Sequence, residues 1–274
     1  MSRRPVGYLL LAGGALVMLY PLAWLVAGSV KPSDEIFNGS GLWPRQPTLD
    51  NYRTGWAALG VGFGTFFANS FVISVAAVLG NLLSCSMAAY AFARLSFRFR
   101  RLWFAVMLLS IMLPIHVLII PQYTLFQRLG WINTFLPLIV PKFLGVDGFF
   151  IFLMVQFIRS LPTELDDAAR LDGCGPVRIY LRIILPLMAP VLVATAVLTF
   201  IWTWDDFFSQ LVFLDDAGHY TVPLALRAFV DSSGPSNWGQ LLAMATLSLI
   251  PMVLFFVVFQ RRIIEGVAAT GPRG

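Results

Sequence analysis

The sequence has little charge for its length. Only 12% of its 274 residues are Asp, Glu, Lys or Arg, whereas a soluble domain usually carries about 25%. Hydrophobic residues make up 58%, so most of the chain must lie in lipid. The net charge of +5 comes from arginines in short clusters between apolar runs. That is the pattern of a membrane protein, whereas a nucleic-acid-binding protein gathers its basic residues on one face.

Residues that build disulfide, metal and nucleotide sites are also scarce. Cys85 and Cys174 are too few for a disulfide framework, and with only two histidines they form no cluster with metal-ligand spacing. The only lysines, Lys31 and Lys142, do not follow the glycine-rich run of a P-loop. No nucleophile, base or metal set is clustered, which disfavours a membrane-embedded enzyme. We therefore expect no catalytic residue, no metal and no cofactor in this chain.

Six apolar runs are long enough to cross a bilayer, which takes about 20 residues per helix. They lie at about 6–30, 64–92, 102–121, 135–158, 187–212 and 241–260. The first run is longer than the core of a signal peptide, so we expect a retained span. Prolines interrupt the third and fourth runs, which indicates a packed bundle or a pathway there. The sequence therefore predicts an all-α polytopic membrane protein with six transmembrane helices in one domain, 1–274.

The basic residues indicate the orientation of these spans. Thirteen of the 19 Lys and Arg lie in the amino-terminal segment, the loops after the second and fourth runs, and the carboxyl-terminal tail. Positive loops stay in the cytoplasm. We therefore expect both termini to be cytoplasmic.

The cytoplasmic loop 159–186 has the pattern of a short capped helix. Thr163 stands three residues before Asp166, like a capping box with Asp in place of the usual Glu or Gln. Gly173 suits the position just past a helix end, where a left-handed residue is often needed. We predict a helix of about nine residues over 164–172, about 14 Å long.

The residues of this predicted helix differ between its faces. Glu164, Asp166 and Asp167 put negative charge in the first turn, where the helix dipole favours it. A small, mostly apolar face is formed, by helical spacing, by Leu165, Ala168, Ala169 and Asp172. Such a helix fits a partner's groove, but the same pattern also fits an ordinary helix at the membrane surface.

A second short helix is predicted to begin at Pro176. Arg178 and Arg182 would lie on one side of it, and Ile179 and Ile183 on another. It would run along the membrane surface before the chain turns into the fifth span.

This loop resembles that of a known family. The order Asp167-Ala168-Ala169, three residues, Gly173, nine residues, Ile183, one residue, Leu185-Pro186 is similar to the Glu-Ala-Ala loop of binding-protein-dependent ABC importer permeases. Asp167 departs from the family's usual Glu by one methylene. Other stretches resemble the family's maltose-type carbohydrate branch: Asn69-Ser70, Ala88 to Leu95, Trp204-Asp205-Asp206-Phe207, and Gln260-Arg261-Arg262 through Gly266 to Gly274. The resemblance covers about 51–274.

The resemblance implies a type I ABC importer permease in a bacterial plasma (inner) membrane. Its partners would be membrane lipid, a second homologous permease subunit, an external solute-binding protein and a cytoplasmic ATPase dimer that binds ATP and Mg²⁺, with no nucleic acid. The helix at about 164–172 would dock on the ATPase and transmit its closure, and the tail 266–274 would reach between the ATPase subunits. The coupling residues would be Glu164, Asp166, Asp167, Ala168, Ala169, Asp172 and Gly173.

The outer loop 212–240 resembles the segment that reaches into the binding protein in the maltose-type branch. Turn-forming residues in it suit such a probe. The candidate contacts are Gly234, Pro235, Asn237 and Trp238. A passive connection would fit the loop as well, because outer loops vary freely.

A candidate solute path lies near the end of the fifth run. It consists of Trp202, Trp204, Asp205 and Asp206. Aromatic rings stack on the C–H faces of sugars, and carboxylates accept hydrogen bonds from their hydroxyls. The alternative is ordinary anchoring, because Trp is enriched at membrane interfaces. These residues favour a neutral or amino sugar, while an oligosaccharide or a polyol phosphate also fits the branch.

The alternative function is an ion-coupled secondary transporter or channel. Such a protein needs buried ionisable groups at several mid-span positions and usually contains inverted repeats. Nearly all charges of this sequence are expected in loops or at span ends, which favours the importer permease.

Overall fold

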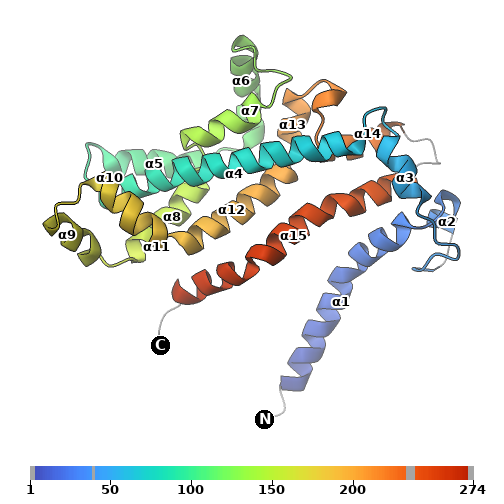
Figure 1. Ribbon diagram of the computed structural model, residues 1–274, viewed down its shortest axis with the longest axis horizontal. Helices are drawn as coiled ribbons and strands as arrows, with labels where there is room; N and C mark the ends of the chain where they lie inside the picture. Colours follow the sequence, from blue (N-terminus) through green and yellow to red (C-terminus); the bar gives the residue numbers. More distant parts are fainter. Residues whose placement is uncertain (1–3, 39–40, 233–237, 271–274) are drawn as a thin grey trace. The chain divides into compact units, whose positions relative to one another are not determined.

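The computed structural model describes residues 4–38, 41–232 and 238–270, and all regular structure within them is helical (Figure 1). Chain contacts divide the protein into two compact units. Unit 1 comprises 1–68 and 221–251, and unit 2 comprises 69–220 and 252–274. The all-α prediction is therefore confirmed.

Two long helices, α4 and α15, have one end in each unit. The helices that begin in unit 1 are α1 (Arg4–Ser29), α2 (Ser33–Asn38), α3 (Asp50–Ala57), α4 (Phe63–Arg94), α14 (Val222–Ser232) and α15 (Trp238–Thr270). Those of unit 2 are α5 (Arg100–Ile111), α6 (Ile115–Arg128), α7 (Leu136–Ile139), η1 (Val140–Leu144), α8 (Gly148–Ser160), α9 (Glu164–Leu171), α10 (Pro176–Ile179), η2 (Tyr180–Ile184), α11 (Leu185–Leu187), α12 (Ala189–Trp204), α13 (Phe208–Phe213) and η3 (Ala217–His219).

Four stretches of the described residues are long and apolar enough to cross a membrane. They are Gly7–Ser29, Phe63–Arg94, Leu136–Ser160 and Trp238–Gln260. Two bent helix pairs, α5 with α6 and α10–α11 with α12, bring the number to six if each pair is one span. This count agrees with the six apolar runs.

The third and fifth spans differ in shape from the expected single helices. The third is bent by 103° between α5 and α6, where Pro114 immediately precedes α6 and cannot continue the hydrogen bonding of α5. The fifth, expected over 187–212, ends at Trp204. There the Asp206 carboxylate accepts a hydrogen bond from the Ser209 N–H (3.0 Å), a local bond that favours the start of a new helix, α13.

Unit 1 is held together by buried polar and aromatic side chains. Asn51 of α3 is buried, and its Nδ2 donates to the carbonyl oxygens of Ser29 (2.9 Å) and Lys31 (2.7 Å) after α1. The ring of Phe63 lies 6.2 Å from that of Phe229. These contacts tie α1, α3, α4 and α14 into one unit.

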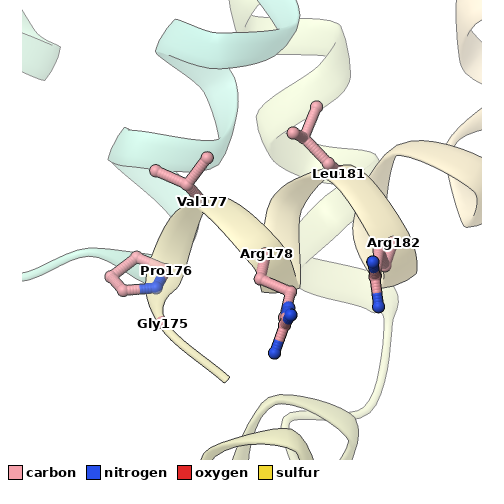
Figure 2. A pocket seen from close by; sticks show the side chains of 6 residues that line it. All are labelled: Gly175, Pro176, Val177, Arg178, Leu181 and Arg182. Atoms are coloured by element: carbon pink, nitrogen blue, oxygen red, sulfur yellow. The ribbon is translucent and has the colours of Figure 1, made fainter. Parts of the chain in front are cut away.

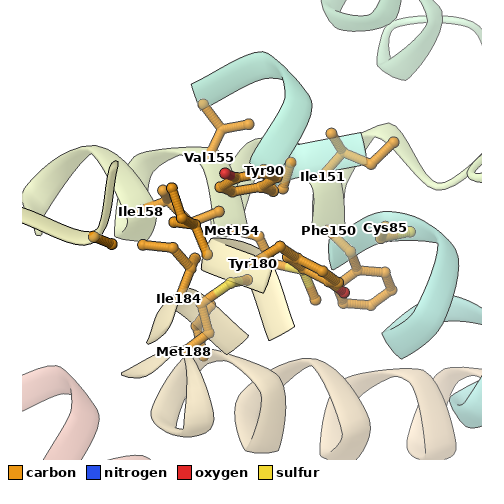
Figure 3. Close-up of a cluster of buried hydrophobic side chains, with 14 residues drawn as sticks. Cys85, Tyr90, Phe150, Ile151, Met154, Val155, Ile158, Tyr180, Ile184 and Met188 are labelled. Atoms are coloured by element: carbon orange, nitrogen blue, oxygen red, sulfur yellow. The ribbon is translucent and has the colours of Figure 1, made fainter. Parts of the chain in front are cut away.

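The core of unit 2 lies between α4, α8 and the segment α10–α11 (Figure 3). The rings of Tyr90 and Tyr180 are 5.3 Å apart, and the Tyr180 hydroxyl shares a 2.7 Å hydrogen bond with Ser86 Oγ. Met154 and Ile158 of α8 are fully buried against them. Ala169 of α9 belongs to the same cluster, so this core also holds α9 in place.

Gly80 of α4 is a position where the packing of unit 2 requires glycine. A Cβ there would lie 2.8 Å from Phe143 Cδ2 and 3.0 Å from the backbone carbon of Lys142. We expect Gly80→Ala to destabilise the protein by about 1–3 kcal/mol through overpacking. The midpoint of thermal unfolding in detergent measures this. Gly13→Ala in α1 is the control, because a Cβ at Gly13 has no neighbour within 4 Å. Equal midpoints for the two variants would contradict the prediction.

Candidate coupling site

The helix predicted over 164–172 is α9, Glu164–Leu171, and it lies beyond the adjoining ends of α8 and α10 (Figure 1). The capping-box prediction is wrong. Thr163 is itself helical (φ −72°, ψ −22°), and its side chain makes no capping hydrogen bond. Asp166 does not reach back to Thr163, because its carboxylate is turned toward Arg94.

Gly173 ends α9 as the sequence indicates. Its φ of +79° is left-handed. The Gly173 N–H donates to the carbonyl of Arg170 (3.0 Å), and the Cys174 N–H donates to that of Ala169 (2.9 Å). This pair of bonds is the Schellman motif, which satisfies carbonyls at a helix end and favours glycine.

The inner face of α9 is fixed by Asp166 and Ala169, which are both buried. Arg94 Nε, at the end of α4, lies 3.1 Å from Asp166 Oδ2, and these two side chains are only 7% and 4% exposed. Arg94 Nη2 also donates to the carbonyl of Leu161 (2.7 Å), just after α8. The predicted face of Leu165, Ala168, Ala169 and Asp172 is therefore divided, because Ala169 packs inward while the other three are exposed.

The outer face of α9 is acidic, with one prominent apolar side chain. Leu171 is 90% exposed. Asp167 is also exposed and forms a 3.2 Å ion pair with Arg170 one turn later. The remaining exposed coupling candidates are Glu164, Ala168, Asp172 and Gly173.

A shallow hollow of about 450 Å³ follows α9 in the chain (Figure 2). It is lined by Gly175, Pro176, Val177, Arg178, Leu181 and Arg182. Val177 and Leu181 are more than half exposed, and the two arginines lie on another side of the same helical segment. Ile179 is buried, whereas Arg178 and Arg182 are exposed.

The four residues of the predicted solute path do not gather at one place. Trp202 is half exposed, and its ring lies 5.5 Å from Phe149 and 5.3 Å from Phe150. Trp204 is buried and stacks on Phe200. Asp205 is exposed at the end of α12, and Asp206 caps α13.

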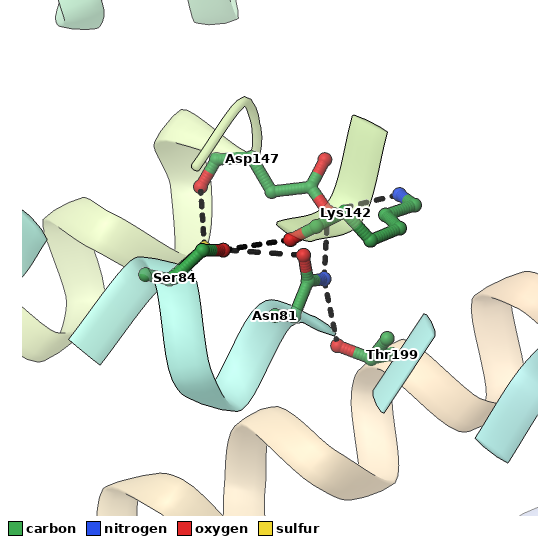
Figure 4. A network of polar contacts seen from close by, with 6 residues as sticks. Asn81, Ser84, Lys142, Asp147 and Thr199 are labelled. Carbon is green, nitrogen blue, oxygen red and sulfur yellow. Dashed lines mark hydrogen bonds and ion pairs between the residues drawn. The ribbon is translucent and has the colours of Figure 1, made fainter. Parts of the chain in front are cut away.

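An ion pair inside the fourth span was missed by sequence reasoning (Figure 4). Asp147 Oδ2 accepts hydrogen bonds from Lys142 Nζ (2.9 Å) and Asn81 Nδ2 (2.6 Å), and Asn81 Nδ2 also reaches Thr199 Oγ1 (3.2 Å). Nearly all charges were expected in loops or at span ends, whereas Lys142 and Asp147 both lie within the candidate span Leu136–Ser160. The signal was available, since a lysine and an aspartate five residues apart interrupt an otherwise apolar run.

A cavity of about 210 Å³ lies beside this ion pair. Its lining includes Asp147, the aromatic residues Phe149 and Trp202, and Ser110 and Ile111 of α5. Within the part of the chain that the structure describes, no three His, Cys, Asp or Glu side chains come together as metal ligands. The arrangement has the chemistry to bind a neutral polar molecule: a hydrogen-bond acceptor next to aromatic rings.

Three of the four predicted contacts in the outer loop 212–240 lie outside the described residues. Gly234, Pro235 and Asn237 belong to that part, while Trp238 begins α15 with its ring 5.4 Å from Phe37. The backbone of the tail is helical as far as Thr270, and 271–274 lie outside the described residues.

The combination of a short helix that ends at a left-handed glycine and several helices apolar enough to cross a membrane agrees with a family comparison. Residues 80–268 match the model of the binding-protein-dependent transport system inner membrane component family. The chain belongs to this family.

Individual relatives cover almost the whole chain. The arabinooligosaccharides transport system permease protein AraQ of Halalkalibacterium halodurans is 35% identical over 95% of this chain and 93% of its own length. The trehalose/maltose transport system permease protein MalG of Thermococcus litoralis is 32% identical, again over 95% and 93%. A crystal structure of a bacterial ABC transporter involved in the import of the acidic polysaccharide alginate has a chain of the same fold, with a TM-score of 0.83, 23% identity and coverage of 95% and 98%.

These findings confirm the predicted family and fold. The chain is the permease subunit of an ABC importer, with the type I permease fold, and it is a transport subunit that needs no cofactor of its own. Nothing found supports the alternative of an ion-coupled transporter.

Proposed function

We propose that this chain and a second homologous permease subunit form the membrane pathway for a neutral sugar or short oligosaccharide. An external solute-binding protein would deliver the solute, and a cytoplasmic ATPase dimer with bound ATP and Mg²⁺ would supply the energy. The importer would lie in a bacterial plasma membrane, with both termini of this chain cytoplasmic. Support for the solute class comes from the relatives, whose names refer to arabinooligosaccharides and to trehalose and maltose.

The observation that carries the coupling role is the division of α9 into a fixed inner face and an open outer face. Asp166 and Ala169 hold the helix, so they act by positioning it rather than by touching the ATPase. Glu164, Asp167, Ala168, Leu171 and Asp172 remain exposed for a partner. The neighbouring hollow adds exposed Val177 and Leu181 beside Arg178 and Arg182. A groove with matching apolar and charged groups would bind this surface specifically.

The cavity beside Asp147 is the part of the chain best suited to contact the solute. Asp147 Oδ2 is occupied by Asn81 and Lys142, whereas the other carboxylate oxygen points away from Asn81 (Figure 4). That oxygen can accept a hydroxyl hydrogen, and Trp202 offers an aromatic face. Lys142 is already paired with Asp147, so an anionic solute would meet a carboxylate without a free counter-charge. The chemistry favours a neutral sugar over a phosphate.

Three further contacts stay predictions. The outer loop 212–240 would reach the binding protein through Gly234, Pro235, Asn237 and Trp238. The tail 266–274 would reach between the ATPase subunits. Asp205, exposed at the end of α12, would line the path beyond the cavity.

Reconstitution tests this function. Proteoliposomes with both permease subunits, the ATPase and the binding protein should take up a neutral disaccharide only with ATP inside, and sn-glycerol 3-phosphate should not compete. Ala168→Arg should lower both ATPase binding and uptake by roughly tenfold, because a long charged side chain enters the docking surface. Asp167→Glu is the control and should retain coupling, because the family whose loop this one resembles uses Glu there.

Three results would contradict the proposal. Solute uptake without the ATPase would show that transport does not depend on coupling to it. Undiminished ATPase binding by the Ala168→Arg variant would show that the ATPase does not dock on α9. Preferential uptake of the phosphate would leave the importer intact but overturn the sugar assignment.

A further inference from the structure

The guanidinium group of Arg94 joins three segments that are separate in the sequence. Arg94 is the last residue of α4, its Nε pairs with Asp166 on α9, and its Nη2 donates to the carbonyl of Leu161 after α8. Neither Asp166 oxygen has a hydrogen-bond partner among the described residues. The Arg94 charge is therefore what balances this buried carboxylate, and removing either partner would leave the other buried and uncompensated.

The attachments of α9 to the rest of unit 2 are few. Its inner face contributes two buried residues, Asp166 and Ala169. Toward its carboxyl end the chain passes through Gly173 and Gly175, where added side chains would meet nothing within 4 Å. A force on the outer face of α9 is thus carried mainly by the ion pair with α4 and by the small contact of Ala169.

The helix α4 connects this ion pair with the cavity beside Asp147. It is an unbroken helix of 32 residues, and Asn81 lies 13 residues before Arg94, about 20 Å along the axis. Asn81 in turn donates to Asp147 and Thr199. A shift of α4 therefore moves a hydrogen-bond donor of Asp147, the one acidic residue that lines the cavity.

We propose that Arg94 is a positioning residue that passes the movement of α9 to α4 and so to the Asn81–Asp147 contact. This inference rests on the proposed docking of the ATPase on α9. It assigns to Arg94 a role beyond the membrane topology that its positive charge also serves. A topological role requires only a positive charge near the membrane, whereas the coupling role requires the pair with Asp166.

The test uses the complete importer in proteoliposomes. Arg94→Ala and Asp166→Asn should each leave ATPase binding and hydrolysis near wild type but lower the number of solute molecules taken up per ATP by roughly tenfold. The two substitutions together should cost no more than one alone, because they remove the same contact. Arg98→Ala is the matched control, since Arg98 is an exposed residue of the same basic cluster whose guanidinium lies over Phe99. It should leave the ratio unchanged.

An unchanged ratio in Arg94→Ala and Asp166→Asn would overturn the inference. If either variant fails to accumulate in the membrane, the double variant Arg94→Asp with Asp166→Arg is measured instead, because it restores an ion pair with the two charges exchanged. If the exchanged pair restores both the amount of importer in the membrane and the number of solute molecules taken up per ATP, the coupling role is supported. If it restores the amount of importer but not the uptake per ATP, the coupling role is overturned. Absence of ATPase binding in the unmodified importer is a different outcome, because it overturns the docking of α9 itself.

Discussion

Gly173→Val is expected to abolish ATP-driven uptake while the chain still inserts into the membrane. Gly173 has a φ of +79°, which a β-branched residue adopts only with strain, and its N–H and that of Cys174 satisfy the last carbonyls of α9. Valine would move the chain out of this conformation and displace the outer face of α9. Uptake per ATP in proteoliposomes measures the effect, and membrane fractionation measures insertion. We expect a loss of more than about tenfold in coupling.

Gly175→Val is the matched control for this experiment. Gly175 lies two residues later in the same exposed loop, but its φ of −75° and ψ of 167° are open to any residue, and a Cβ there has no neighbour within 4 Å. Gly175 also lines the hollow next to α9, so the comparison is between the two variants: Gly175→Val leaves the left-handed stop of α9 intact and should retain far more uptake per ATP than Gly173→Val. If Gly173→Val retains coupling, the left-handed stop of α9 is not required for transmission.

Asp147→Leu is expected to destabilise the chain more than the simultaneous loss of Asp147 and Lys142. The single change leaves the Lys142 ammonium in an apolar span without its carboxylate, at a cost of roughly 2 kcal/mol for a pair that retains some exposure. Lys142→Met combined with Asp147→Leu removes both charges and should restore most of the stability. The midpoint of thermal unfolding in detergent compares the variants.

Measuring solute uptake by the double variant distinguishes the effect of this ion pair on stability from the proposed contact of Asp147 with the solute. The double variant should be stable, yet it lacks the hydrogen-bond acceptor in the cavity, so its affinity for a neutral sugar should remain low. Normal uptake by the double variant would show that Asp147 serves stability alone. Equal stability of the single and double variants would contradict the prediction that the charges compensate each other.

The helical class and the stop of α9 could be predicted from the sequence because they depend on local features. Long apolar runs indicate spans in any context, and a glycine after a short helix indicates a left-handed end. The start of α9 at Glu164 was also predicted, but its capping box was predicted wrongly because Asp166 had two possible partners. The Asp166 carboxylate pairs with a distant arginine, Arg94, and does not accept a hydrogen bond from the backbone N–H of Thr163.

The role of Arg94 could not be predicted because it depends on an ion pair with a residue far away in the sequence. Arg94 has the same sequence signature as its exposed neighbours, and only the position of α9 distinguishes it from Arg98. In contrast, the different environments of Trp202 and Trp204 could have been predicted. Trp202 and Trp204 are two residues apart, and residues at that spacing do not share a helix face. One of them accordingly lines the cavity, and the other is buried.

The closeness of Lys142 and Asp147 in the chain also bears on how the protein is made. They are five positions apart, so their ion pair can form within one nascent segment before that segment packs against α4, whose Asn81 donates to Asp147. A hydrophobic segment that carries its own neutralised pair presents no net charge to the bilayer during insertion. The cost of burying each charge is thereby reduced at the time of biosynthesis, and the later packing of α4 has only to complete a site that is already neutral.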